Sequence, residues 1–112
     1  MRIIKFRIWC KVSNKYHYNW IKHVEQTDDD LLVWEQFTGL LDKEGREIYE
    51  GDIIKCIGIG AKFEEELTGM VFFQDAEYCI DTNHCKWPVA SFHVLKNKEI
   101  IGNIHENSNI LN

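Results

Sequence analysis

The N-terminal residues alternate between apolar and polar side chains. Over residues 2–10, Ile4 and Phe6 are separated by basic neighbours, and this period-two pattern predicts a β-strand with one face toward solvent. Residues 16–21 alternate in the same way, and the Ser-Asn-Lys sequence at 13–15 is typical of a turn. The two segments are therefore expected to pair as a hairpin.

The middle of the chain contains two turn signals around short apolar pieces. Residues 31–38 are interpreted as a strand, with a single helical turn as the alternative. Residues 42–45 end in a glycine, which permits the positive φ of a four-residue turn. The Glu-Gly-Asp sequence at 50–52 predicts a second tight turn that leads into a strand at residues 53–57. The charged residues 62–66 predict an exposed hairpin tip or loop.

The C-terminal half predicts further strands. Residues 68–75 and 78–80 are expected to form a hairpin around a Gln-Asp-Ala-Glu turn. Residues 89–95 fit a strand and a short helix about equally well. A turn at residues 96–98 is expected before a last strand at residues 99–105.

Gly102 lies inside this last strand and indicates a bulge or a close approach of two backbones. The tail from Asn107 is expected to fray, although Ile110 and Leu111 could dock. The whole pattern gives six to eight short strands, no long helix, no repeat and no linker. It predicts a single, mainly-β domain over residues 1–112, built as a small barrel or sandwich.

Size and composition narrow the class of protein. The 112 residues are 45% hydrophobic and 12% aromatic with one proline, which is typical of a folded chain with one dense core. No apolar run reaches the ~18 residues of a membrane span, and charges interrupt the apolar N-terminal stretch, unlike a secretory signal. We therefore expect a cytoplasmic protein whose four cysteines are reduced.

Charge is divided unevenly along the chain. Residues 1–24 carry six bases and no acid, whereas residues 25–112 carry 7 bases and all 18 acids, so +6 and −11 give the net charge of −5. The basic segment either binds an acidic partner or a phosphate, or packs against acidic groups of its own fold or of a neighbouring subunit; we favour the second interpretation.

The basic segment and its aromatic neighbours define a candidate interaction surface. Its residues are Arg2, Lys5, Arg7, Trp9, Trp20 and Trp34. Basic and aromatic side chains together can bind single-stranded nucleic acid by stacking, but the acidity of the rest of the chain argues against that partner.

The cysteines and histidines do not have the spacing of a metal or nucleophilic site. Cys79, His84 and Cys85 lack the paired Cys-x2-Cys arrangement of structural zinc, so no metal is expected. A pairing of Cys85 with His93 has no support from spacing. We interpret the apolar-flanked Cys10, Cys56 and Cys79 as core or interface residues.

Two carboxylates lie close together at the second turn. Glu50 and Asp52 could serve as an acid–base pair. Turn chemistry explains Asp52 better, because its side chain can bond backbone groups across Gly51. The sequence also contains no glycine-rich phosphate-binding motif. We therefore predict a protein that is not an enzyme and needs no cofactor.

Several stretches form longer motifs. The chain opens with M-R-x-I-K-F-R-x-W, and residues 36–53 read Q-F-T-G-L-x-D-K-x-G-x-x-I-Y-E-G-D-I. Later blocks are G-x-V-x-F at residues 69–73 and E-I-I-G-N-I-H-E-N at residues 99–107. These motifs resemble those of the YopX family of phage and prophage proteins and span almost the whole chain. Two positions depart from the family pattern: His105 stands where Tyr is more usual, and Ala76 where Gly is common.

The resemblance implies a mainly-β fold with an SH3-like barrel, a homo-oligomer, a phage or prophage origin and no established activity. It supplies no catalytic or ligand residues, and we expect a structural role for its motif residues, which are Thr38, Gly39, Asp42, Gly45, Tyr49, Gly51, Asp52, Gly102 and Asn103. The expected function is a non-enzymatic protein-interaction module that acts on a phage or host protein. The alternative is a nucleic-acid-binding accessory protein.

Overall fold

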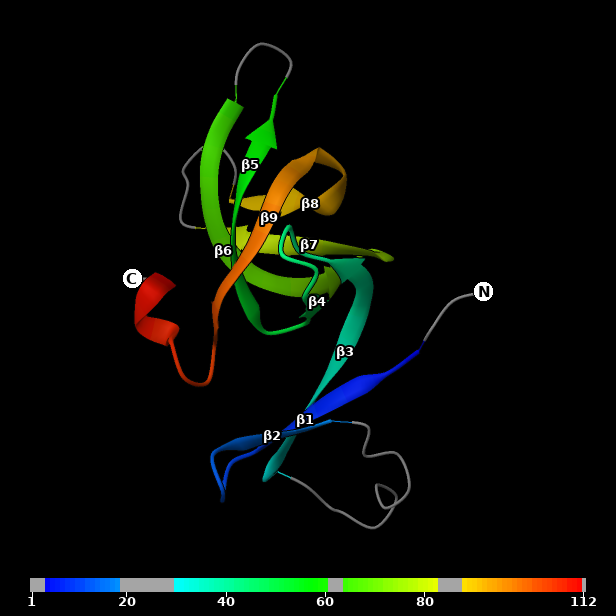
Figure 1. Cartoon of the computed structure of the whole chain (residues 1–112), viewed down its shortest axis with the longest axis vertical. Helices are drawn as coiled ribbons and strands as arrows, with labels where there is room; N and C mark the ends of the chain where they lie inside the picture. The colour runs from blue at the N-terminus through cyan, green and yellow to red at the C-terminus, as the bar shows by residue number, and fades with distance from the viewer. Residues whose placement is uncertain (1–3, 19–29, 61–63, 83–87, 112) are drawn as a thin grey trace.

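The described residues of the protein form two β-sheets. The structure, a computed structural model, describes residues 4–18, 30–60, 64–82 and 88–111. About 66% of it is strand and 8% helix, arranged as a curled half-barrel and a second sheet. Figure 1 shows the half-barrel in the upper part of the view and the second sheet below it. The expected mainly-β fold, a small barrel with extra strands and little helix, is confirmed.

The second sheet has four antiparallel strands and contains the N-terminal hairpin. Its strands are β1 (Phe6–Cys10), β2 (Lys15–Tyr18), β3 (Leu32–Leu41) and β4 (Glu47–Tyr49), in the order β2-β1-β3-β4. β1 and β2 pair across a turn at residues 11–14, in which Asn14 has a φ of 55°. The predicted hairpin is confirmed within the described residues.

The half-barrel is a five-stranded antiparallel sheet. Its strands are β5 (Asp52–Ile59), β6 (Glu64–Gln74), β7 (Glu77–Thr82), β8 (Val89–Ser91) and β9 (Leu95–Asn103), in the order β8-β7-β6-β5-β9. The short 3-10 helix η2 (Phe92–Val94) connects β8 to β9, and η3 (Ser108–Leu111) follows the sheet.

The main apolar core lies inside the half-barrel. Its buried residues are Ile48, Ile54, Cys56, Leu67, Val71, Ile80, Ala90 and Leu95. In β5 and β6 they occupy alternate positions, because successive side chains of a strand point to opposite faces of the sheet. Ile48 comes from β4, so the second sheet places one fully buried side chain in the core of the half-barrel.

Two predicted loops are parts of strands. Residues 64–66 lie in β6 and pair with residues 57–59 of β5, so they belong to a hairpin, one of the two predicted alternatives, and not to a loop. Residues 96–98, predicted as a turn, lie inside β9. Asn97 has a φ of 54° and the register between β5 and β9 shifts beside it, which is the geometry of a bulge. The polar side chains of both segments do not show the alternation that predicts a strand. The strands form nevertheless, because their pairing is made by the backbone and an exposed face tolerates charge.

Two ambiguous segments are resolved by the structure. Residues 31–38 form a strand rather than a helical turn, and β3 continues beyond them to Leu41. Residues 89–95 combine both alternatives, since β8 is followed directly by η2. Ser91 separates the two elements, because its hydroxyl accepts a hydrogen bond from the backbone N–H of His93 at 3.2 Å.

Gly102 occupies the irregularity that its sequence position predicted. The register of β9 against β5 shifts between Ile53 and Ile54, opposite this glycine. A Cβ atom at Gly102 would lie 2.8 Å from the side chain of Asn107, so the glycine leaves room for that side chain. The tail forms a helical turn instead of fraying, since the N–H of Ile110 bonds to the carbonyl of Asn107, and η3 contacts β6.

Candidate functional site

A buried cluster of charged side chains joins the two sheets. Arg7 of β1 donates from Nε to Oε1 of Glu35 in β3 at 2.8 Å, and its Nη2 lies 2.9 Å from Oδ1 of Asp52 at the start of β5. All three side chains are at least 95% buried. A charge removed from water needs a partner. Arg7, Glu35 and Asp52 are therefore held together, and with them the strands that carry them.

Two tyrosine rings enclose the guanidinium group of Arg7. Its Cζ lies 4.1 Å from the ring centre of Tyr16 in β2 and 4.8 Å from that of Tyr49 in β4. Burial lowers the pKa of Arg7, but the attraction of Asp52 and Glu35 outweighs it and the net pKa is raised. Burial also raises the pKa of both tyrosines, which keeps their hydroxyls protonated. The cation is thus fixed between neutral rings.

Glu35 is bound by side chains from both parts of the molecule. The hydroxyl of Tyr16 donates to its Oε1 at 3.0 Å, and Nε2 of His105 lies 2.8 Å from its Oε2. The imidazole of His105 is stacked on the indole of Trp9, with ring centres 4.6 Å apart and planes within 3° of parallel. These contacts attach the segment after β9 to the inner face of the second sheet.

The turn at residues 50–52 carries the second carboxylate of this cluster. The backbone N–H of Tyr49 donates to Oδ2 of Asp52 at 2.8 Å, so the predicted turn role of Asp52 is confirmed. Burial raises the pKa of Asp52, although Arg7 opposes this shift. The neighbouring Glu50 accepts a hydrogen bond from the backbone N–H of Gln36 at 2.6 Å. Both members of the candidate acid–base pair are therefore used by the fold.

The turn at residues 42–45 binds β9. Oδ1 of Asp42 accepts from the backbone N–H groups of Glu44 and Arg46 at 2.9 Å, and Oδ2 accepts from the N–H of Ile100 at 3.0 Å. Burial by itself raises the pKa of Asp42, but these hydrogen bonds outweigh it and the net pKa is lowered. Gly45 closes the turn with a φ of 84°.

Other motif residues also hold local backbone geometry. Thr38 accepts a hydrogen bond at its hydroxyl from the backbone N–H two residues later, and Gly39 has a φ of 86°. Oδ1 of Asn103 accepts from the N–H groups of His105 and Glu106, both at 3.0 Å. Asn103 thereby shapes the turn that carries His105 to Glu35.

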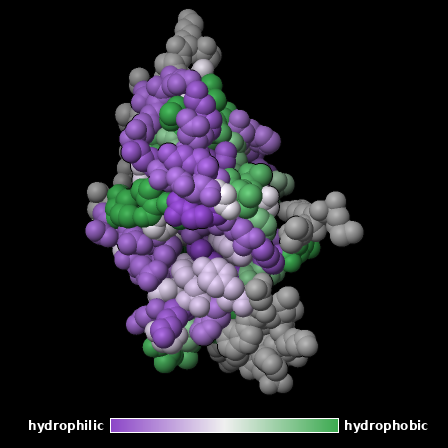
Figure 2. Space-filling view, in the orientation of Figure 1, coloured by the Kyte–Doolittle hydropathy of each residue, from purple (hydrophilic) through white to green (hydrophobic). Residues whose placement is uncertain are grey.

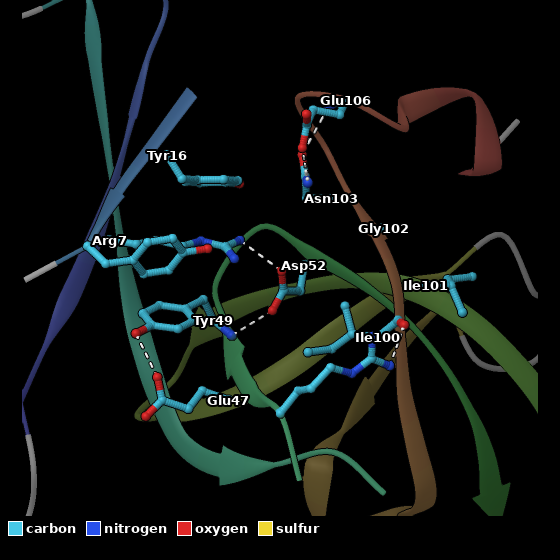
Figure 3. Close-up of a pocket in the computed structure, with 12 residues that line it drawn as sticks. Arg7, Tyr16, Glu47, Tyr49, Asp52, Ile100, Ile101, Gly102, Asn103 and Glu106 are labelled. Atoms are coloured by element: carbon cyan, nitrogen blue, oxygen red, sulfur yellow. Dashed lines mark hydrogen bonds and ion pairs between the residues drawn. The ribbon is translucent and has the colours of Figure 1, made fainter. Parts of the chain in front are cut away.

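A cleft of about 620 Å³ lies between the two sheets. One side is formed by Tyr16, Tyr18 and Tyr49, and the opposite side by residues 100–103 of β9. Figure 2 shows a hollow between the upper and lower parts of the molecule. In Figure 3, Arg7 reaches from the second sheet to Asp52 across this space. The charged cluster therefore forms part of the wall of an open cleft.

The structure divides the candidate interaction surface of the sequence into different environments. Arg7 and Trp9 are each 5% exposed, so their prediction as surface residues is wrong. Trp34 is exposed at 37%. Lys5 is half-buried and forms an ion pair with Glu47. Arg2 and Trp20 lie outside the described residues.

The favoured interpretation was that the basic segment packs against acidic groups of its own fold or of a neighbouring subunit. It is confirmed for the ion pairs of the described residues. Lys5 binds Glu47, and Arg7 binds Glu35 and Asp52, so these bases pack against acids of the same fold. Hydrogen bonding to Lys5 lowers the pKa of Glu47.

The cysteines among the described residues are not arranged as a metal site. Cys56 and Cys79 are buried as expected, Cys10 is half-buried, and all three are free thiols. Burial raises the pKa of Cys56 to about 11. Within residues 4–18, 30–60, 64–82 and 88–111, no group of His, Cys, Asp and Glu is arranged to hold a metal ion. His84 and Cys85 fall outside these ranges.

Sequence reasoning missed the centre of the site. Glu35, Tyr16 and His105 were not among the candidate residues. One signal was present, since Glu35 shares a strand face with Val33 and Phe37, and an acid among apolar neighbours on an inward face needs a buried cation. Its partner Arg7 lies 28 positions away, and only the pairing of β1 with β3 brings the two together.

The two sheets and the cleft define a mainly-β protein in which a half-barrel is extended by a polar, aromatic-faced sheet. The family model described as YopX protein matches residues 5–112, and the chain belongs to the YopX family. The fold is similar to the crystal structure of protein EF1440 from Enterococcus faecalis, with 21% identity, a TM-score of 0.68 and 100% coverage of both chains. No curated protein matches the sequence. Within the described residues, no helix is long and apolar enough to cross a membrane.

Proposed function

We propose that this chain is a non-enzymatic protein-interaction module of a phage or prophage, which self-associates and acts in the cytoplasm of the bacterial host. Membership of the YopX family supports the origin. The observation that carries the proposal is the use of the charged groups. Arg7, Glu35 and Asp52 bind one another inside the molecule, whereas the opposite face of the same sheet exposes aromatic side chains.

The outer face of the second sheet is the proposed surface for a second copy. Phe6 and Trp34 are 36% and 37% exposed, and their rings meet edge-to-face with centres 5.6 Å apart. Large exposed aromatic side chains are typical of interfaces. Lys15 shares this face, since it pairs with Cys10 of β1, and its positive charge favours an acidic region of the second copy as the partner of this face.

Sedimentation velocity over a range of concentrations tests this proposal. The native protein is expected to form a defined oligomer, and Trp34→Ser is expected to shift it toward monomer. Val89→Ser is the matched control, because Val89 is 49% exposed on β8 of the other sheet. A protein that stays monomeric at the highest concentration, or an oligomer that Trp34→Ser leaves intact, contradicts this use of the outer face.

The nucleic-acid alternative loses much of its support. Arg7 and Trp9, two of the residues on which it depended, are buried and bonded. A labelled single-stranded oligonucleotide at low salt is the direct probe, because binding through phosphates weakens steeply as salt is added. Salt-sensitive binding of that probe would replace the protein-interaction proposal.

A further inference from the structure

We infer that the cleft between the two sheets binds a basic, extended segment of a partner polypeptide. This inference deepens the proposed interaction role and rests on it, but it uses a different surface from the outer face that carries Trp34. The two proposals are separable, because one concerns self-association and the other concerns a ligand between the sheets.

The size and shape of the cleft suit a short stretch of chain. Its volume of about 620 Å³ lies in the range of ordinary ligand sites. In Figure 3, Glu47 and Glu106 lie at opposite ends, with Tyr16, Tyr49 and Asp52 between them. A ligand that contacts both ends is elongated, as an extended peptide is.

The charge of the cleft favours a cation. Two basic side chains, Arg7 and Arg46, line the cleft against three carboxylates, which are those of Glu47, Asp52 and Glu106. Both bases are already paired inside the protein, Arg7 with Glu35 and Asp52 and Arg46 with Asp42, whereas Glu106 is exposed. The carboxylate excess therefore repels a nucleic acid and attracts lysine or arginine side chains.

The tyrosines supply the second element of recognition. Tyr18 is 53% exposed, and its ring meets that of Tyr49 edge-to-face at 5.9 Å. The faces of aromatic rings attract cations. The molecule already uses this contact for its own Arg7, which lies between Tyr16 and Tyr49. Tyr18 extends the same aromatic wall into the open cleft, where a basic side chain of a partner would meet an exposed ring next to carboxylates.

Fluorescence anisotropy with designed peptides tests the inference. The probe is a fluorescein-labelled short peptide of alternating alanine and arginine at low ionic strength, and its matched control carries neutral citrulline in place of arginine. The arginine peptide is expected to bind, and the citrulline peptide to bind at least about tenfold more weakly, because it keeps the shape and loses the charge.

Two pairs of variants locate the binding. Tyr18→Ala is expected to weaken binding about fivefold and Glu106→Gln about threefold, as the loss of one exposed cation–π contact and one exposed ion pair. The matched controls are Phe73→Ala and Glu44→Gln, which change an exposed aromatic and an exposed acid away from the cleft and are expected to leave binding unchanged. Circular dichroism verifies that each variant is folded.

Independent readouts keep the outcomes distinct. Amide NMR signals of Gly102 and Asn103, which line the cleft, are expected to shift with the arginine peptide. Equal weakening by all four variants, equal binding of the citrulline peptide, or no binding would overturn the inference. Sedimentation of the same samples separates the proposals. Peptide binding by a monomer rejects the proposed self-association and supports the cleft site. An oligomer that does not bind the peptide supports self-association and rejects the cleft site.

Discussion

The half-barrel and its contact with the second sheet are held together by different forces. Inside the half-barrel, apolar residues such as Ile54 and Ile80 are fully buried. At the contact with the second sheet, Arg7, Glu35 and Asp52 are almost as deeply buried but are charged. The burial of apolar surface stabilises the fold in proportion to its area, and apolar packing tolerates rearrangement. A buried ion cluster adds little net stability, yet it penalises any arrangement that separates its members.

This difference indicates what each region contributes. We expect the half-barrel core to supply most of the free energy of folding, and the charged cluster to select one orientation of the second sheet. That orientation keeps the cleft open with tyrosines on one side and β9 on the other. Four predictions test the comparison, in order of decreasing effect.

Removing the cation of the cluster is expected to have the largest effect. Arg7→Ala leaves Glu35 and Asp52 buried without their partner, and we expect a loss of about 3–5 kcal/mol in the free energy of unfolding. Urea denaturation measures it. Lys5→Ala is the control, because the half-exposed Lys5–Glu47 pair is worth only about 0–1 kcal/mol. Equal losses in the two variants would show that the buried cluster has no special role.

Truncation of the apolar core is expected to be slightly less damaging. Ile54→Ala leaves a cavity in the half-barrel, with an expected loss of about 2–4 kcal/mol. Because no charge is involved, this loss is expected to be the same at low and high salt. Thermal unfolding at two salt concentrations measures it, and a strong salt dependence would contradict the division between apolar core and charged cluster.

A comparison of two glycines tests how closely the two sheets approach each other. Gly51 and Gly45 have nearly equal φ angles of 86° and 84°, but a Cβ at Gly51 would overlap the Glu35 carboxylate, whereas Gly45 has nothing within 4 Å. Gly45→Ala is expected to lose about 1 kcal/mol through backbone strain alone. Gly51→Ala is expected to lose about 2 kcal/mol or more because it also displaces Glu35. Similar losses of unfolding free energy in the two variants, measured by urea denaturation, would mean that the Glu35 side chain moves aside at no cost.

The smallest effect concerns the pH dependence of the turn that binds β9. The pKa of Asp42 is lowered from its ordinary 3.8, so its carboxylate stabilises the fold above that value. The stabilisation is lost as pH falls through the folded-state pKa. Asp42→Asn is expected to lose about 1–2 kcal/mol at neutral pH and to approach the native protein below pH ~3. Unfolding curves across that interval test this, and a gap that stays constant would exclude Asp42 as the titrating group.

Much of the fold followed from local sequence pattern. Alternation predicted the first hairpin and the strands of the half-barrel, because an inward-facing position in a strand requires an apolar side chain. The turn chemistry of Asp52 and the irregularity at Gly102 were also predicted, since both depend on neighbouring backbone geometry. The strand at residues 64–66 was missed, because its partners in β5 lie across a hairpin and its side chains face solvent.

The sequence by itself determined the strand periodicity, the tight turns and the presence of a basic segment that needs acidic partners. Only the tertiary structure decided which acids those are. Arg7 meets Glu35 through the pairing of β1 with β3, and Asp52 through the packing of the second sheet on the half-barrel. His105 reaches Glu35 over 70 positions of chain. Such contacts depend on how distant strands pack, and neither composition nor local periodicity predicts that packing.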